Sequence, residues 1–116
     1  MQAPQRKLLG KLLQLLELRM QQADLWQVSR PEARAFESQE PFCVDTMSLE
    51  QWLRYVFIPR MQALLDAVAP LPSACALTPQ VEMQLDSRSQ ALVSEVTLAI
   101  DLLLTKGKVP SCHLLQ

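Results

Sequence analysis

A run of carboxylates is the first pattern in this sequence that could do chemistry. Glu32, Glu37, Glu40 and Asp45 lie within a short span, and a pair of carboxylates can serve as general acid and base. Acidic residues in such runs are mostly exposed to solvent, so we predict no catalytic dyad here. For Asp45 we expect local capping, in which its carboxylate accepts N–H groups at the start of the helix that follows, with a binding role as the alternative.

The cysteines and the single histidine offer nucleophilic catalysis or metal binding. The sequence has three cysteines, an odd number, at positions that lie far apart and include no C-x-x-C pair: Cys43, Cys75 and Cys112. This pattern argues against a disulfide framework or a zinc site. A cysteine nucleophile needs a base that converges with it in space, whereas the only histidine, His113, directly follows Cys112. We therefore predict free thiols in a reducing compartment, with no metal and no cofactor.

Two arginines are the remaining candidates for a ligand or a tether. Arg54 and Arg60 are six positions apart, so on a regular helix they point in different directions. A tether that holds the preceding loop is favoured over ligand binding, because arginine is the usual residue in partly buried pairs. We predict in particular that Asp45 and Arg60 are structural partners, directly or through a shared helix end, that dock this loop.

Composition and charge limit the classes of protein that fit. The chain has 116 residues, of which 49% are hydrophobic, and 11 basic against 12 acidic side chains give a net charge of -1. We predict one domain over residues 1–116, with a core at about 5–106 and a loosely held tail at 108–116. Only 2 glycines occur, which excludes a glycine-rich phosphate loop. We expect a cytoplasmic protein with no membrane contact, because no apolar run approaches the ~20 residues of a membrane span.

The near-neutral charge argues against strong autonomous binding of nucleic acid. The best candidates for such a contact are basic residues of the first expected helix: Arg6, Lys7, Lys11 and Arg19. Their spacing is that of any solvated helix face. We therefore predict no strong binding of nucleic acid by the chain alone.

Hydrophobic periodicity predicts an all-α fold. Leucines recur at helical spacing over residues 4–24. Ser48 with Gln51 has the form of a capping box that opens a second long helix to about position 69, which Pro59 is expected to kink. Residues 25–47 lack sustained periodicity, so we expect either a packed loop or a functional one, with room for one helical turn at 31–36. Three aromatic residues favour packing, because they can pin the loop across the helix ends: Trp26, Phe36 and Phe42.

The second half of the chain predicts two more helices. Thr78 as N-cap and Pro79 open a short helix, and Ser87 with Gln90 gives a second capping box before a third long helix. This helix ends at Gly107, which can adopt the left-handed conformation. Three long helices and one short helix must bury their apolar faces against one another, so we predict a small antiparallel helical bundle.

Several motifs resemble one family of small bacterial proteins. They are Pro41-Phe42-Cys43-Val44-Asp45-Thr46-Met47, Gln51-Trp52-Leu53 and Phe57-Ile58-Pro59-Arg60-Met61. This stretch closely resembles the YqcC-like family, and the resemblance covers about residues 8 to 104. Family members usually read Trp-Leu-Gln-Trp where this chain has Trp52-Leu53-Arg54-Tyr55. The resemblance implies a helical bundle of uncharacterised function and an association at the gene level with tRNA pseudouridine synthase C.

These arguments together predict a non-enzymatic interaction protein with a protein partner, and an accessory role beside a tRNA-modifying enzyme is its most specific form. Pseudouridine synthases use an aspartate in a large mixed α/β catalytic domain, for which this chain has neither strands nor room. The expected recognition surface lies at about residues 41–60. Its candidate residues are Phe42, Asp45, Trp52, Arg54, Tyr55 and Arg60.

Two alternatives stay open at this point, and the sequence does not determine the oligomeric state. A small enzyme or catalytic fragment linked to tRNA pseudouridylation requires Asp45, Arg60 and a cysteine to line one pocket. A carrier of a small apolar ligand requires an internal cavity where Pro59 kinks its helix.

Overall fold

The computed structural model describes residues 3–109 and contains only helical elements over that range. The α-helices are α1 (Ala3–Gln22), α2 (Leu49–Trp52), α3 (Ile58–Asp66), α4 (Thr78–Gln84) and α5 (Ser87–Lys106). The shorter segments are the 3-10 helices η1 (Ala33–Glu37) and η2 (Pro41–Cys43) and the π-helix η3 (Leu53–Phe57). The all-α prediction is confirmed. Most of the predicted tail, with Cys112 and His113, lies outside the described residues.

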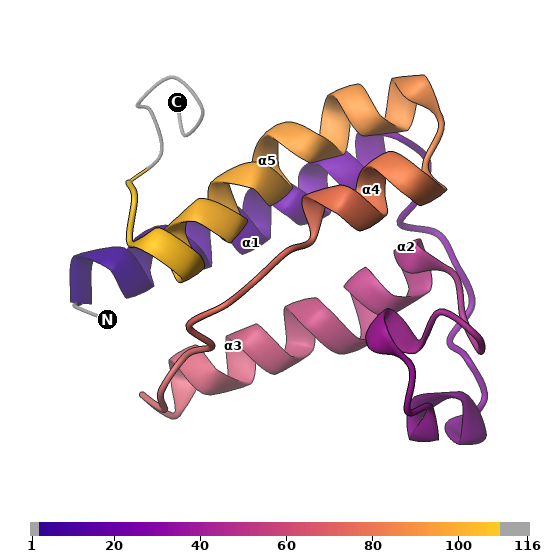
Figure 1. Ribbon diagram of the computed structural model, residues 1–116, viewed down its shortest axis with the longest axis horizontal. Coiled ribbons are helices and arrows are strands. Elements are labelled where there is room, and N and C mark those ends of the chain that lie inside the picture. The colour runs from indigo at the N-terminus through magenta and orange to yellow at the C-terminus, as the bar shows by residue number, and fades with distance from the viewer. Residues whose placement is uncertain (1–2, 110–116) are drawn as a thin grey trace.

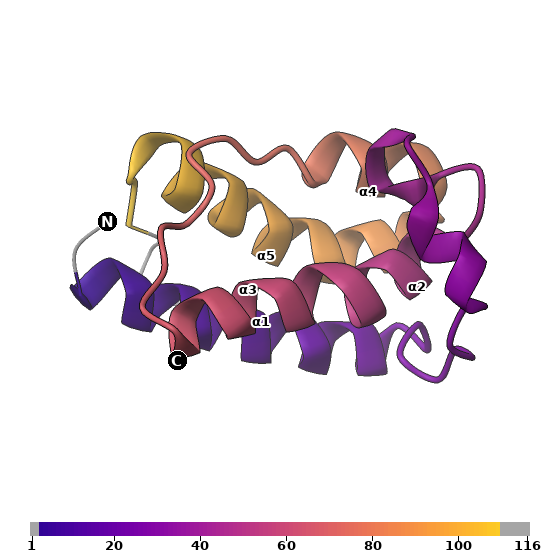
Figure 2. The same cartoon turned by 90° about the horizontal axis from the view of Figure 1, so that it is seen from below.

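The long helices form an antiparallel bundle (Figures 1 and 2). Helix α5 runs along α1 in the opposite direction, the α2–η3–α3 stretch packs against α1, and α4 lies on α5. The loop of residues 23–48 covers one end of the bundle. Apolar side chains at helical spacing fill the space between the elements, among them Leu12, Leu16, Leu53, Val96 and Ile100. This arrangement is the predicted bundle of three long helices and one short helix.

Two arginines of α1 fix the registry of the bundle. The Arg6 guanidinium donates a hydrogen bond of 2.9 Å to the carbonyl oxygen of Leu64 on α3. The Arg19 guanidinium donates to the carbonyl of Leu92 at 2.8 Å and forms an ion pair with Glu95, also at 2.8 Å. Two of the four basic residues that the sequence offered for a nucleic-acid contact therefore hold α1 against its neighbours.

The second long helix begins as predicted and contains a π-helical segment directly before Ile58 and Pro59. Ser48 and Gln51 form the capping box. Proline lacks an N–H and its ring crowds the carbonyl four residues earlier, which is the reason a kink was expected. The helical hydrogen-bond ladder widens at this point: the Ile58 N–H donates to the carbonyl of Leu53, five residues back, within the π-helical segment. The three helical segments run on as one continuous helix (Figure 2).

The starts of the last two helices differ from the prediction. Thr78 is already helical, and the cap position falls on Leu77. Helix α5 is capped by Asp86, whose side chain accepts from the Ser89 N–H, so the predicted capping box at Ser87 is wrong. Aspartate is among the strongest N-cap residues, and it directly precedes the serine chosen from the sequence pattern. Pro79 does occupy the first turn of α4, as predicted.

Glycine ends α5 as predicted. Gly107 has a φ of 67°, in the left-handed region that glycine adopts without steric cost. The N–H groups of Gly107 and Lys108 donate to the carbonyls of Leu103 and Leu102, which satisfies two terminal acceptors of the helix.

Candidate functional site

The loop between α1 and α2 is held by aromatic side chains, as predicted. Trp26 and Phe42 are partly buried against the main core. Phe36 packs with Val56 and Met47 in a second, smaller cluster. The predicted helical turn is present as η1, which begins at position 33.

Polar side chains of the second helix tie the same loop down through its backbone carbonyls. The Arg54 guanidinium donates to the carbonyl of Trp26 and lies over the Trp26 ring, 4.5 Å from its centroid. The Tyr55 hydroxyl donates to the carbonyl of Val28 at 2.8 Å. Arg30, on the loop, lies over the Tyr55 ring at 5.7 Å. A loop without regular structure keeps its buried carbonyls satisfied in this way.

The predicted pairing of Asp45 with Arg60 is wrong. Asp45 accepts a hydrogen bond from the Ser38 hydroxyl within the loop, and its carboxylate does not cap the helix that follows. The ion pairs among residues 3–109 are Arg19–Glu95 and Arg88–Asp24. The tether that was predicted for an arginine exists, but Arg54 provides it and a carbonyl accepts it.

Three aromatic rings meet where the loop joins the second helix. Phe42 packs edge-on against Trp52, with ring centroids 4.8 Å apart, and Trp52 stacks on Phe57 at 5.6 Å. Such contacts add about 0.5–1.5 kcal/mol per pair beyond burial of the rings. Phe42 has a φ of 59°, a conformation that strains a residue with a side chain. The packing of the Phe42 ring against Trp52 offsets that strain.

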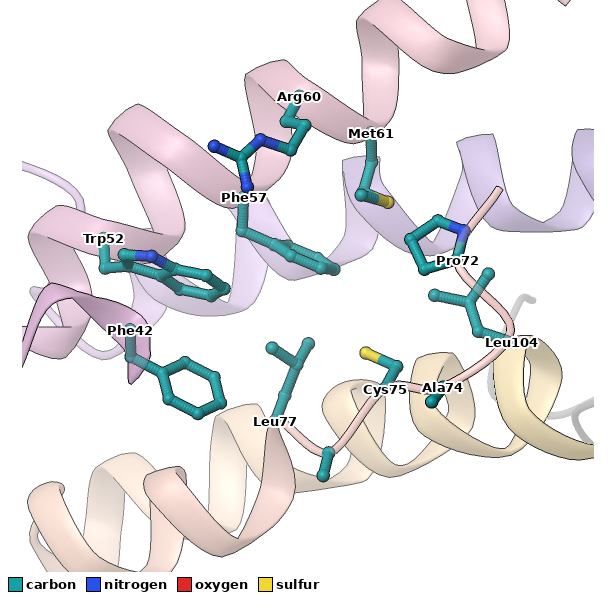
Figure 3. A pocket seen from close by; sticks show the side chains of 11 residues that line it. Phe42, Trp52, Phe57, Arg60, Met61, Pro72, Ala74, Cys75, Leu77 and Leu104 are labelled. Carbon is teal, nitrogen blue, oxygen red and sulfur yellow. The ribbon is translucent and has the colours of Figure 1, made fainter. Parts of the chain in front are cut away.

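Beside the aromatic rings lies a pocket of about 260 Å³ (Figure 3). One wall comes from the second long helix and the opposite wall from the segment that leads into α4, with Leu104 of α5 at one end. The lining residues are Phe42, Trp52, Phe57, Arg60, Met61, Pro72, Ala74, Cys75, Ala76, Leu77 and Leu104. The lining is apolar except for the Arg60 guanidinium and the Cys75 thiol.

The Cys75 thiol is held in its protonated form. Burial raises the pKa of Cys75 from 9.0 to about 12, and a hydrogen bond to Asp101 and the negative charge of that carboxylate add to the shift. The thiolate is the reactive form of cysteine. At neutral pH Cys75 is therefore an inert part of the pocket wall.

Asp101 positions this wall from the neighbouring helix. It is 8% exposed and lies on α5. Its two carboxylate oxygens accept from the N–H groups of Leu77 and Thr78, at 2.8 and 3.0 Å. These N–H groups belong to the start of α4, so Asp101 satisfies donors that the helix itself leaves unpaired.

The structure separates the six candidate residues into three groups. Phe42, Trp52 and Arg60 line the pocket. Arg54 and Tyr55 hold the loop from the same helix. Asp45 is exposed in the loop and is not part of the pocket lining.

The enzyme alternative required Asp45, Arg60 and a cysteine to line one pocket. Arg60 and Cys75 do line it, but Asp45 does not, and the Cys75 thiol is protonated. Residues 3–109 contain no group of three or more histidine, cysteine or acidic side chains that could hold a metal ion. Within the same range, none of the helices is long and apolar enough to cross a membrane.

Sequence reasoning missed the second wall of the pocket. This wall belongs to the connection between α3 and α4, to which the sequence predictions gave no role, and includes Pro72, Cys75 and Leu77. Asp101 was not among the predicted site residues, although a carboxylate within the apolar run of residues 98–104 was the signal that could have revealed it. A buried carboxylate requires hydrogen-bond donors, and those donors lie 24 and 23 positions away along the chain.

The fold and pocket define a small all-helical protein with an apolar recess and one exposed cation at its rim. The chain belongs to the family described as tRNA pseudouridine synthase C, whose profile matches residues 8–103. This description is the family's label and does not establish an activity of the chain.

Individual relatives agree with this assignment. The chain is 42% identical over 83 residues to the uncharacterised protein YqcC of Escherichia coli K12. The aligned residues make up 70% of this chain and 76% of that protein. It is 33% identical to YqcC from E. coli as solved by solution NMR, with a TM-score of 0.76 over 94% of this chain and 95% of that chain. The resemblance to the YqcC-like family is confirmed, and so is the helical fold that it implied.

Two further relatives match over shorter spans. An uncharacterised protein of Haemophilus influenzae is 54% identical over 70 residues, which are 60% of this chain and 66% of that protein. A protein of Pectobacterium carotovorum named tRNA pseudouridine synthase C is 51% identical over 57 residues, which are 49% of this chain and 15% of that protein. Most of the Pectobacterium protein therefore lies outside the matched segment.

Proposed function

We propose that this chain is a non-enzymatic interaction protein that acts beside a tRNA pseudouridine synthase. The observation that carries the proposal is the Pectobacterium protein, in which a segment like this one makes up 15% of a chain named as the synthase. A covalent link holds two modules at a high effective concentration. A separate chain of the same family has no covalent link, so it must bind the synthase through an interface to stay close to it.

The geometry of the pocket supports a binding role over a catalytic one. Most of its lining residues are aromatic or aliphatic, and the Cys75 thiol is protonated. Asp45, the acidic residue among the candidates, does not line the pocket and accepts a hydrogen bond from Ser38 in the loop. Apolar recesses with a few polar groups are typical of binding sites. A chain that acts beside a tRNA-modifying enzyme must be in the same compartment as that enzyme and its tRNA. The proposal therefore includes a cytoplasmic location.

The test uses the purified chain and the purified tRNA pseudouridine synthase C of the same bacterium. Isothermal titration calorimetry after nuclease treatment measures their direct binding without bridging tRNA. Mass spectrometry measures pseudouridine formed in tRNA by the synthase alone, by the chain alone and by both together. We expect a complex, and no pseudouridine from the chain alone. The absence of a complex, or pseudouridine formed by the chain alone, would contradict the proposal.

A further inference from the structure

The mouth of the pocket carries a cation that the fold does not use. Arg60 is exposed on α3 and lines the recess. Within residues 3–109 its guanidinium has no hydrogen-bond or ion-pair partner, in contrast to Arg6, Arg19 and Arg54, which all bind neighbouring groups. None of the lining residues is acidic. The pocket thus presents a positive charge next to an apolar surface.

The volume of the recess limits the size of the group that can occupy it. Its volume of about 260 Å³ is below the ~300–1,000 Å³ that is usual for pockets that enclose a whole small molecule. It suits one bulky side chain of a partner protein, and such buried anchors carry most of the binding energy of an interface. Figure 3 shows the Trp52, Phe57 and Leu77 side chains turned toward this space.

We infer that the pocket receives a single aromatic or large aliphatic side chain of the synthase, and that a carboxylate adjacent to this side chain pairs with Arg60. The inference rests on the proposed function and names the part of this chain that meets the partner. Charge complementarity selects the acidic neighbour, because an arginine guanidinium binds carboxylates in a two-pronged geometry. The rigid rings of Trp52 and Phe57 need no reordering when the anchor enters, which lowers the entropic cost of binding.

Two variants address the two parts of the site, and each has a matched control. Arg60→Glu reverses the charge at the mouth, and Arg34→Glu makes the same change at another exposed arginine without an ion pair in the described chain. Ala74→Trp places a large side chain in the recess, and Ala91→Trp places it on an exposed position of α5. Thermal unfolding verifies that all four variants fold as the parent chain does.

Calorimetry with the synthase then measures the contribution of the pocket. We expect Arg60→Glu and Ala74→Trp each to weaken binding by about tenfold or more, while the two controls stay within about twofold of the parent chain. If the parent chain binds the synthase and both pocket variants bind equally well, the inference fails and the proposed function stands.

A second measurement does not depend on the synthase. The probe is N-acetyl-tryptophan, which carries an apolar ring beside a carboxylate, and the neutral control is N-acetyl-tryptophanamide. In NMR titrations of the labelled chain, we expect N-acetyl-tryptophan to shift the indole N–H signal of Trp52 and leave that of Trp26 unchanged. The amide should bind several-fold more weakly, and Arg60→Met should abolish that difference. Equal binding of both probes, or shifts confined to Trp26, would overturn the inference.

A small amphipathic molecule as the true occupant gives a different result. Titration with decanoate, a free fatty acid anion, tests this alternative. It distinguishes a small amphipathic anion from a protein side chain with a carboxylate next to it. Decanoate binding at Trp52 that is much tighter than binding of N-acetyl-tryptophan, and that competes with the synthase, would overturn the assignment of a protein side chain.

Discussion

Among individual residues, Arg54 has the largest share in holding the loop. Its guanidinium combines a hydrogen bond to a backbone carbonyl with a stacked position over the Trp26 ring. The carbonyl belongs to a loop that has few other polar contacts with the helix, the main ones coming from Tyr55 and Gln51.

We predict that Arg54→Met lowers the free energy of unfolding by about 1–3 kcal/mol. The substitution keeps most of the aliphatic stem but leaves the Trp26 carbonyl without its donor and removes the cation from the ring. Urea denaturation followed by circular dichroism measures the change. Arg34→Met, at an exposed arginine with no ion pair in the described chain, is the control and should change stability by less than about 0.5 kcal/mol. An equal effect of both substitutions would show that Arg54 does not hold the loop.

The raised pKa of Cys75 predicts how stability depends on pH in the alkaline range. Burial raises the pKa of the native thiol from 9.0 to about 12. Above pH 9 the unfolded chain therefore loses a proton that the native chain keeps, and the native state binds more protons. The free energy of unfolding must then fall as pH rises from 9 toward 12, because the slope follows the difference in bound protons between unfolded and native states.

The experiment compares the parent chain with Cys75→Ala over this pH range. Other groups titrate there too, but they are common to both chains, so the difference between the two curves isolates Cys75. We expect the parent chain to lose stability more steeply than Cys75→Ala above pH 9. Alkylation of Cys75 by iodoacetamide should also be slow at pH 8. Parallel curves together with rapid alkylation would contradict the protonated state assigned to this thiol.

At the scale of elements, local patterns in the sequence predicted where the α-helices lie, although the starts of α4 and α5 were misplaced by one residue. The leucine repeat predicted α1, the Ser48 and Gln51 pair marked the start of α2, and Gly107 marked the end of α5. Each of these signals acts within one or two turns of the chain, and hydrophobic periodicity reports the buried face directly. The fold class followed because such helices must cover each other's apolar faces.

The site was less accessible to sequence reasoning because its contacts join distant segments. Phe42, Trp52 and Arg60, which the sequence suggested for a binding surface, all line the pocket. The wall formed by Cys75 and Leu77 was missed because Asp101 of α5 positions it. The proposed pair of Asp45 and Arg60 was wrong because charge alone does not identify a partner when a nearby serine or a carbonyl competes for the same group.

The turn directly after α3 contains a strained residue whose replacement should stabilise the protein. Val68 has a φ of 53° and is 77% exposed. The left-handed region is unfavourable for a β-branched residue, and glycine adopts it without that penalty. We predict that Val68→Gly raises the free energy of unfolding by about 1 kcal/mol, as measured by thermal denaturation.

The control for this change is Val44→Gly. Val44 is also exposed, at 52%, but has an ordinary right-handed φ of -62°. There glycine only increases the freedom of the unfolded chain, so Val44→Gly should lower stability. Loss of stability in both variants would show that the left-handed conformation at Val68 carries no strain.

For the whole molecule, the distribution of charge bears on the proposed relation to a tRNA-modifying enzyme. The chain has a net charge of -1, so no overall field attracts a polyanion. Among the basic residues of α1, Arg6 and Arg19 are engaged with neighbouring helices, which leaves Lys7 and Lys11 exposed. Each phosphate contact requires a free cation, and these contacts provide most of the affinity in non-specific binding.

We therefore predict that the isolated chain binds tRNA only weakly at low salt and not measurably at physiological salt. Few phosphate contacts mean little counterion release, so the small affinity at about 50 mM salt should vanish by about 200 mM. Fluorescence anisotropy with labelled tRNA at both salt concentrations makes the measurement, and Lys7→Gln with Lys11→Gln removes the exposed cations of α1. Sub-micromolar binding at physiological salt that these substitutions abolish would mean that the chain itself recruits tRNA, and that its place beside the synthase depends on RNA and not on the Arg60 pocket.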